Sequence, residues 1–169
     1  MVKRGFFGMG ITAGWEKIHE TVLTSPATSI IVTGLNLEAD KVYMMIFFWV
    51  NATAQGSDAS LYINNDTTRA HYYRQQLIAS GTTVCWERHN DATFIAGFSN
   101  SVTLSKITMM KAPGTVTKTI NEYNEEAPAS TAIVRLDQVY TLTENVTQIE
   151  IRADSVNTMS PGTRLIIFR

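Results

Sequence analysis

The run VYMMIFFWV at Val42–Val50 decides the fold of this 169-residue chain. Side chains of a strand alternate between two faces, so a strand made of these nine residues is apolar on both faces. A sheet in a two-layer sandwich has only one dry face, so the second apolar stripe needs a further cover, such as a loop, an arm or a neighbouring subunit. We assign this role to four residues and predict that they form a self-association strand: Tyr43, Met45, Phe47 and Trp49.

The rest of the chain predicts an all-β fold. Short alternating runs rich in Thr, Ser and β-branched residues are separated by turn residues at intervals of about a dozen residues, and no window shows a helical period. This pattern favours an antiparallel β-sandwich of jelly-roll type. The expected strands are residues 15–23, 28–33, 41–50, 59–63, 69–80, 84–86, 92–98, 102–109, 131–136, 147–153 and 164–168.

Three local features refine this expectation. The apolar residues of 102–109 change parity halfway, which predicts a β-bulge near Ser105 or Lys106. Residues 111–128 contain a Pro-Gly pair and the acidic run NEYNEEAP, so we expect an exposed hairpin or a long loop there. The sequence Asn-Asn-Asp-Thr at 64–67 predicts a tight turn, because Asn and Asp tolerate a left-handed backbone.

Residues 1–14 are predicted to be an N-terminal arm, and residues 15–169 a single β-sandwich domain. The glycines of the arm disfavour helix and strand, and they break the apolar core that a secretory signal needs. Its other residues are too apolar for a tail that stays in water. We therefore expect the arm to dock on a partner through Phe6, Phe7, Met9 and Ile11.

Composition argues against several classes of function. The formal charge is −1 and neither half is strongly basic, so the electrostatic footprint of a nucleic-acid-binding protein is missing. The apolar run ends at Asn51, well short of the about 20 residues of a membrane-spanning helix. Cys85 is the single cysteine, which excludes an internal disulfide framework. We find no nucleophile, P-loop or dinucleotide motif, and so expect no catalytic residues, no cofactor and no enzymatic activity.

Two polar segments could bind a cation. Glu87, His89 and Asp91 alternate in one segment, but no second His or Cys pair supports a metal site, so we expect a solvated charged turn. The turn at 64–66 could bind calcium or sugar hydroxyls, although a turn stabilised by its own side chains explains the same residues.

A polar and aromatic cluster could bind a ligand. Its residue types suit stacking on a sugar ring, but aromatic residues and Arg also anchor sheet faces and subunit contacts, and the sequence leaves both interpretations open. The cluster consists of His71, Tyr72, Tyr73, Arg74 and Trp86.

Four segments follow one another in a recognisable order. The chain opens with Trp15-Glu16-Lys17-Ile18, continues with a Thr/Ser-rich strand at 24–33, carries the turn LYINNDT at 61–67 with Tyr72 beyond it, and closes on the apolar strand 165–168. This order resembles a group of structural proteins from tailed phages and related viruses, whose turn usually reads Leu-x-Phe-Asn-x-Asp-Thr. In this chain an isoleucine replaces the aromatic residue of that turn, and an asparagine stands where glycine is common.

The resemblance implies a virion component with a jelly-roll core and no catalytic role. Together with the apolar arm and the two-faced strand, it leads us to expect a capsid decoration or cement protein that self-associates, by analogy as a trimer, and binds capsid or tail proteins. We expect no nucleic-acid or membrane partner. The alternative is a tail-associated module that binds a receptor or a carbohydrate through the aromatic cluster.

Overall fold

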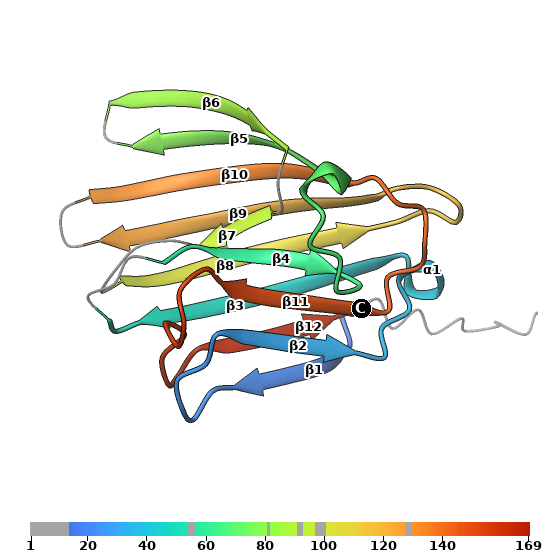
Figure 1. The fold of residues 1–169 in the computed structure, drawn as a ribbon, viewed down its shortest axis with the longest axis horizontal. Helices are drawn as coiled ribbons and strands as arrows, with labels where there is room; N and C mark the ends of the chain where they lie inside the picture. The colour runs from blue at the N-terminus through green and yellow to red at the C-terminus, as the bar shows by residue number, and fades with distance from the viewer. Residues whose placement is uncertain (1–13, 54–56, 81, 91–92, 97–100, 128–129) are drawn as a thin grey trace, which may run out of the picture.

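In a computed structural model the chain forms two antiparallel β-sheets that pack face to face (Figure 1). The structure describes residues 14–53, 57–80, 82–90, 93–96, 101–127 and 130–169. The elements are β1 (Lys17–Val22), β2 (Ser29–Thr33), α1 (Leu37–Asp40), β3 (Val42–Asn51), β4 (Ala59–Ile63), the 3-10 helix η1 (Arg69–His71), β5 (Tyr72–Ser80), β6 (Thr83–His89), β7 (Thr93–Ala96), β8 (Ser101–Met110), β9 (Thr117–Ala127), β10 (Ser130–Tyr140), β11 (Gln148–Ala153) and β12 (Arg164–Phe168).

The order of strands is that of a jelly roll. The larger sheet has eight strands in the order β1-β12-β3-β8-β9-β10-β5-β6, and the smaller has four in the order β2-β11-β4-β7. The chain passes repeatedly from one sheet to the other, so that β1-β12-β3-β8 and β2-β11-β4-β7 form the two halves of the roll. The predicted all-β, jelly-roll-like sandwich is confirmed.

Two additional hairpins enlarge one half of the roll. The hairpin β5–β6 is inserted between β4 and β7, and the hairpin β9–β10 between β8 and β11. Both add to the β8 side of the larger sheet, where the order continues β8-β9-β10-β5-β6. Figure 1 shows these four strands, which we call the extension, projecting beyond the two-layer part of the molecule.

The core lies between the sheets and contains one stripe of β3. Tyr43, Met45, Phe47 and Trp49 are at most 1% exposed and belong to one buried cluster with residues of the smaller sheet such as Ile151. The prediction that these four residues form a self-association surface is therefore wrong. Both stripes of β3 are apolar, so the sequence could not indicate which of them the smaller sheet covers.

The inner face of the extension is built differently. Tyr123, Val134 and Leu136 form a second, small hydrophobic cluster that is separate from the main core. Around it the buried positions are polar, which is why the hydrophobic pattern of these strands is weak. The buried polar residues of the extension and of the adjoining β8 include Gln76, Thr103, Ser105, Thr117, Thr119, Asn121 and Gln138.

Two local predictions are wrong for the same reason. No bulge interrupts β8, whose pairing with β3 and with β9 keeps one register from Val102 to Met110. Its apolar residues change face because Ser105 occupies an inward position. Residues 117–127, predicted to lie in a hairpin or long loop, form the regular strand β9, and the connection from β8 is only the segment 111–116. The inward residues of β9 include Thr and Asn, which concealed the alternation.

The predicted turn at 64–67 is confirmed. Asn64 and Asn65 both adopt a left-handed backbone, with φ of 51° and 61°. The side-chain oxygen of Asn64 accepts hydrogen bonds from the backbone nitrogens of Thr147 and Gln148, which joins the turn to the start of β11. The residues predicted to dock the arm, Phe6, Phe7, Met9 and Ile11, lie outside the described residues.

Candidate binding surfaces on the eight-stranded sheet

The outward stripe of β3 continues onto its neighbours. Ile46 lies opposite Ile166 of β12, and Phe48 lies opposite Leu104 of β8. Phe48 is 38% exposed and Leu104 is 50% exposed, and the smaller sheet covers the opposite face. We call this surface the outer stripe, which comprises Met44, Ile46, Phe48, Val50, Val102, Leu104, Ile166 and Phe168.

A row of ion pairs borders the outer stripe. Glu122 of β9 lies 3.7 Å from Lys106 and 3.6 Å from Arg135, and Arg135 lies 3.6 Å from Asp137. These distances join charged atoms across β8, β9 and β10 on the outer face. We call these four residues the belt. Lys106, Glu122 and Arg135 are direct cross-strand partners, in the row that continues from Ile46 of the outer stripe into the extension.

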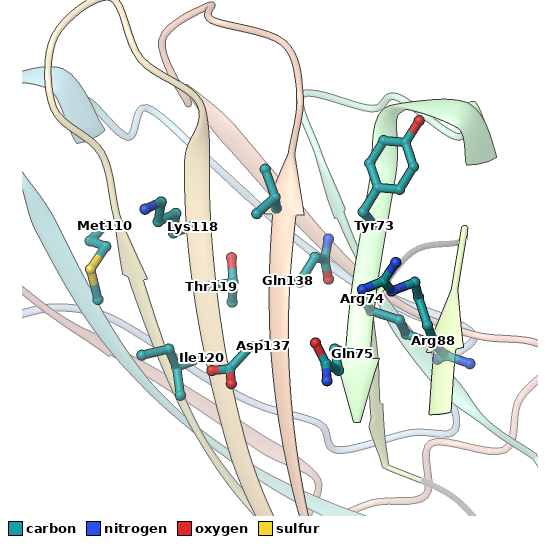
Figure 2. Close-up of a pocket in the computed structure, with 11 residues that line it drawn as sticks. Tyr73, Arg74, Gln75, Arg88, Met110, Lys118, Thr119, Ile120, Asp137 and Gln138 are labelled. Carbon is teal, nitrogen blue, oxygen red and sulfur yellow. The ribbon is translucent and has the colours of Figure 1, made fainter. Parts of the chain in front are cut away.

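The outer face of the extension is hollowed. One hollow of about 500 Å³ lies over the strands from β8 to β6, and Figure 2 shows its side chains. A second hollow of about 320 Å³ is lined by Leu77, Trp86 and Arg135, and it shares Gln75 and Asp137 with the first. We call the two together the groove. Its outward-facing residues are Tyr73, Gln75, Leu77, Trp86, Arg88, Met110, Lys118, Ile120, Arg135, Asp137 and Val139.

The sheet register orders the side chains of the groove. Gln75 lies opposite Arg88 of β6 and opposite Asp137 of β10, and Leu77 lies opposite Trp86. Tyr73 therefore lies at one end of the groove and Trp86 at the other, with a polar row between them. This arrangement follows from the two-residue period of strands, which places residues 73, 75 and 77 on one face.

Two cations of the groove have no ion-pair partner in the part of the chain that the structure describes. Among the described residues, neither Lys118 nor Arg88 makes an ion pair or a side-chain hydrogen bond. Asp137, by contrast, lies 3.6 Å from Arg135 of the belt. The groove thus combines an apolar floor, two available positive charges and one partly neutralised carboxylate.

The predicted aromatic cluster does not form one patch. Tyr73 and Trp86 face the groove and are 46% and 69% exposed, whereas Tyr72 is fully buried. Arg74 has the parity of Tyr72, so its side chain starts from the inner face. His71 precedes β5 and contacts the turn that follows β4. Because side chains alternate along a strand, residues of this cluster that are neighbours in the sequence lie on opposite faces of the sheet.

A hydrogen-bond network fixes the start of β5. The Asp66 carboxylate accepts from the backbone nitrogen of Thr68 at 2.9 Å, from His71 Nδ1 at 2.6 Å and from the hydroxyl of Tyr140 at 3.1 Å. Burial raises the pKa of Asp66, but these hydrogen bonds outweigh it and lower the pKa to about 2. Tyr72 adds a bond from its hydroxyl to the backbone oxygen of Asp66 at 2.7 Å.

The acidic segment of β6 does not assemble a metal site in the part that the structure describes. Glu87 accepts from His89 Nε2 at 2.9 Å and from the side-chain nitrogen of Gln76 at 2.7 Å, and Asp91 lies outside the described residues. Throughout the described ranges, no three His, Cys, Asp or Glu side chains are arranged to hold a metal ion. None of the helices in those ranges is long and apolar enough to cross a membrane.

Sequence reasoning identified Tyr73 and Trp86 but missed the residues between them. Period-two spacing could have added Gln75 to the same face as Tyr73. Lys118 and Asp137 come from strands far away in the sequence, and only the pairing of β9, β10 and β5 brings them together.

Comparisons with protein-family models, with curated proteins and with solved structures found no match.

Proposed function

We propose that this chain is a non-enzymatic structural protein of a virus particle, acting as a capsid decoration or cement protein that self-associates and attaches to the particle through its outer stripe. The carrying observation is the exposed apolar surface of Phe48, Val102 and Leu104 on a sheet whose other face already supplies the core. The motif order that resembles phage structural proteins supports the virion assignment.

The outer stripe has the composition of a protein contact. Its apolar side chains are flanked by charged ones, with Arg164 of β12 opposite Phe48 and Lys106 of β8 opposite Ile46, as in interfaces with an apolar core and a polar rim. Exposed apolar side chains that occur singly need no explanation, but a contiguous set across three neighbouring strands does. A cement protein would use this surface to bind the assembled shell better than the free subunits, and so stabilise the shell by mass action.

A charge placed in the outer stripe tests the proposal. Leu104→Glu should weaken self-association and particle binding by at least about tenfold, because it buries a charge in an apolar contact. Ile133→Glu is the matched control, since Ile133 is 63% exposed on the same face but lies on β10, two strands away from Leu104. Sedimentation velocity between micromolar and hundred-micromolar protein measures association, and co-sedimentation with particles measures attachment.

The results that would support the proposal differ from those that would contradict it. The proposal expects a wild-type oligomer, a Leu104→Glu monomer that keeps the wild-type circular dichroism spectrum, and an Ile133→Glu variant that behaves as wild type. A wild-type protein that stays monomeric and does not bind particles would contradict it, as would a Leu104→Glu variant that still associates fully.

A second function, recognition of a carbohydrate or a receptor, is favoured by the groove. Its two exposed aromatic side chains, Tyr73 and Trp86, lie on the outer face of hairpins that the jelly roll does not need for its own closure. Sites grafted onto a scaffold in this way commonly carry the function of a protein with a widespread fold.

A further inference from the structure

We propose that the groove binds an acidic oligosaccharide, which lies along β5 from Tyr73 to Trp86 and places its carboxylates at Arg88 and Lys118. This inference rests on the second function above and specifies its ligand. It can be tested separately from self-association through the outer stripe, because the two surfaces share no residue.

The length of the groove requires an extended ligand. Trp86 lies opposite Leu77, which is four residues beyond Tyr73 along the same strand. At about 3.4 Å per residue this separation is about 14 Å along β5. The hollows on either side of Gln75 have volumes of about 500 and 320 Å³, within the size range of ligand sites. A single small ion or one sugar ring would fill only part of this space.

The charges select an acidic ligand. Arg88 and Lys118 have no carboxylate partner among the described residues, although the charged residues of the adjoining belt are paired with each other. A guanidinium group matches the geometry of a carboxylate and can donate two parallel hydrogen bonds to it. Lys118 stands on β9 and Arg88 on β6, with β10 and β5 between them. Three spacings of about 4.8 Å between strands and an offset of two residues along them place the two residues about 16 Å apart, so they would bind separate acidic groups.

The polar centre of the groove selects a ligand with hydroxyl groups. Asp137 and Gln75 are cross-strand partners, and together they offer a carboxylate, an amide oxygen and an amide nitrogen at one level. Neighbouring hydroxyls can donate to and accept from such a pair. A chain of phosphates has no neighbouring hydroxyls to offer to this pair, and the groove lacks the many cations that bind a nucleic-acid backbone.

The aromatic ends suit the apolar faces of sugar rings. Tyr73 and Trp86 are about half and two thirds exposed, with 46% and 69% of their surface accessible. An aromatic ring that is anchored in a sheet and open on one side provides a flat apolar surface at little cost in conformational entropy. Val139, opposite Tyr73, and Ile120, which lies beside Asp137 in Figure 2, add apolar surface to the floor.

Isothermal titration calorimetry with the full chain tests this assignment. The probes are tetragalacturonate and a tetramer of sialic acid, the neutral tetrasaccharide of galactose, and an oligothymidylate. The variants are Tyr73→Ala, Arg88→Ala and Lys118→Ala. Two matched controls are available: Lys106→Ala replaces a lysine of the belt on the same face, and Trp15→Ala replaces an exposed Trp before β1, at the opposite edge of the sheet.

We expect saturable binding of at least one acidic tetrasaccharide that weakens at higher salt concentration. Each groove variant should weaken it by about tenfold or more, which corresponds to the loss of one charge-assisted hydrogen bond or one aromatic contact. Both controls should bind as wild type, and thermal unfolding should show that all variants fold.

Three results would overturn the inference. Equal binding of the neutral tetrasaccharide, lost in Tyr73→Ala but not in Arg88→Ala, would retain a carbohydrate site and reject its acidic ligand. Binding of oligothymidylate as tight as that of the sugars would reject the role of Asp137. Absence of saturable binding to any probe at millimolar concentration would reject the carbohydrate function itself, without affecting the proposal for the outer stripe.

Discussion

Replacing Asp66 by Asn should remove a defined part of the pH dependence of folding. The carboxylate accepts hydrogen bonds from three groups, the Thr68 backbone, His71 and Tyr140, at distances between 2.6 and 3.1 Å. These bonds join the turn after β4 to the start of β5 and the end of β10. They therefore also fix the strand that carries Tyr73 at the end of the groove.

The pKa of Asp66 gives the magnitude. Burial opposes ionisation, but the hydrogen bonds prevail and lower the pKa from 3.8 to about 2. A pKa that is lower in the folded than in the unfolded state stabilises the fold at pH values above 3.8, and this stabilisation is lost as the pH falls to about 2. The difference between the two pKa values corresponds to about 2 kcal/mol of unfolding free energy.

Urea denaturation of wild type and Asp66→Asn between pH 7 and pH 2 measures this contribution. At pH 7 the variant should be less stable by about 2 kcal/mol, and the gap should close as the pH approaches 2. Asp137→Asn is the matched control, because the Asp137 side chain is 59% exposed and its nearest cation is an exposed arginine. A gap that is absent at pH 7, or that persists unchanged at pH 2, would refute the role given to the carboxylate.

Two further predictions concern stability and access. Lys111→Met should destabilise the fold by about 2 to 4 kcal/mol, because the buried Lys111 ammonium donates to the backbone oxygens of Thr115 and Thr143 at 2.6 and 2.7 Å and the variant leaves both unpaired. Urea denaturation measures this, and Lys118→Met, at an exposed position, should lose less than about 0.5 kcal/mol. Cys85 is exposed and is the only thiol of the chain, so the folded protein should react with Ellman's reagent about as fast as the urea-unfolded chain. A rate that is slower by about a hundredfold or more would mean that β6 is covered in solution.

Local sequence patterns were sufficient to predict the sandwich, but they did not predict which face of its central strand β3 is buried. The runs at 59–63 and 164–168 were predicted at the bounds where β4 and β12 lie. For β3 the alternation defined two stripes, and only the position of the smaller sheet determines that Phe47 is inside and Phe48 outside. When both faces of a strand are apolar, the sequence pattern does not indicate which face is buried, because this depends on where the rest of the fold packs.

The strand β9 and the groove were not predictable for a related reason. Hydrophobic alternation marks a strand only where one face packs against an apolar layer, and the inward residues of β9 include Thr119 and Asn121. The groove draws Lys118 from this strand, Asp137 from β10 and Arg88 from β6. Their proximity depends on the pairing of two hairpins that are inserted at different points of the chain.

Tyr72 and Tyr140 anchor the extension in the main core, whereas Tyr123, Val134 and Leu136 form a small cluster of their own beneath its outer face. Because this cluster does not belong to the main core, substitutions on the outward side of β9, β10 and β5 need not disturb the packing around Trp49. Residues at non-touching positions contribute almost additively to stability. Substitutions on the outer face of the hairpins can therefore change which ligand they bind while the packing of the sandwich stays the same.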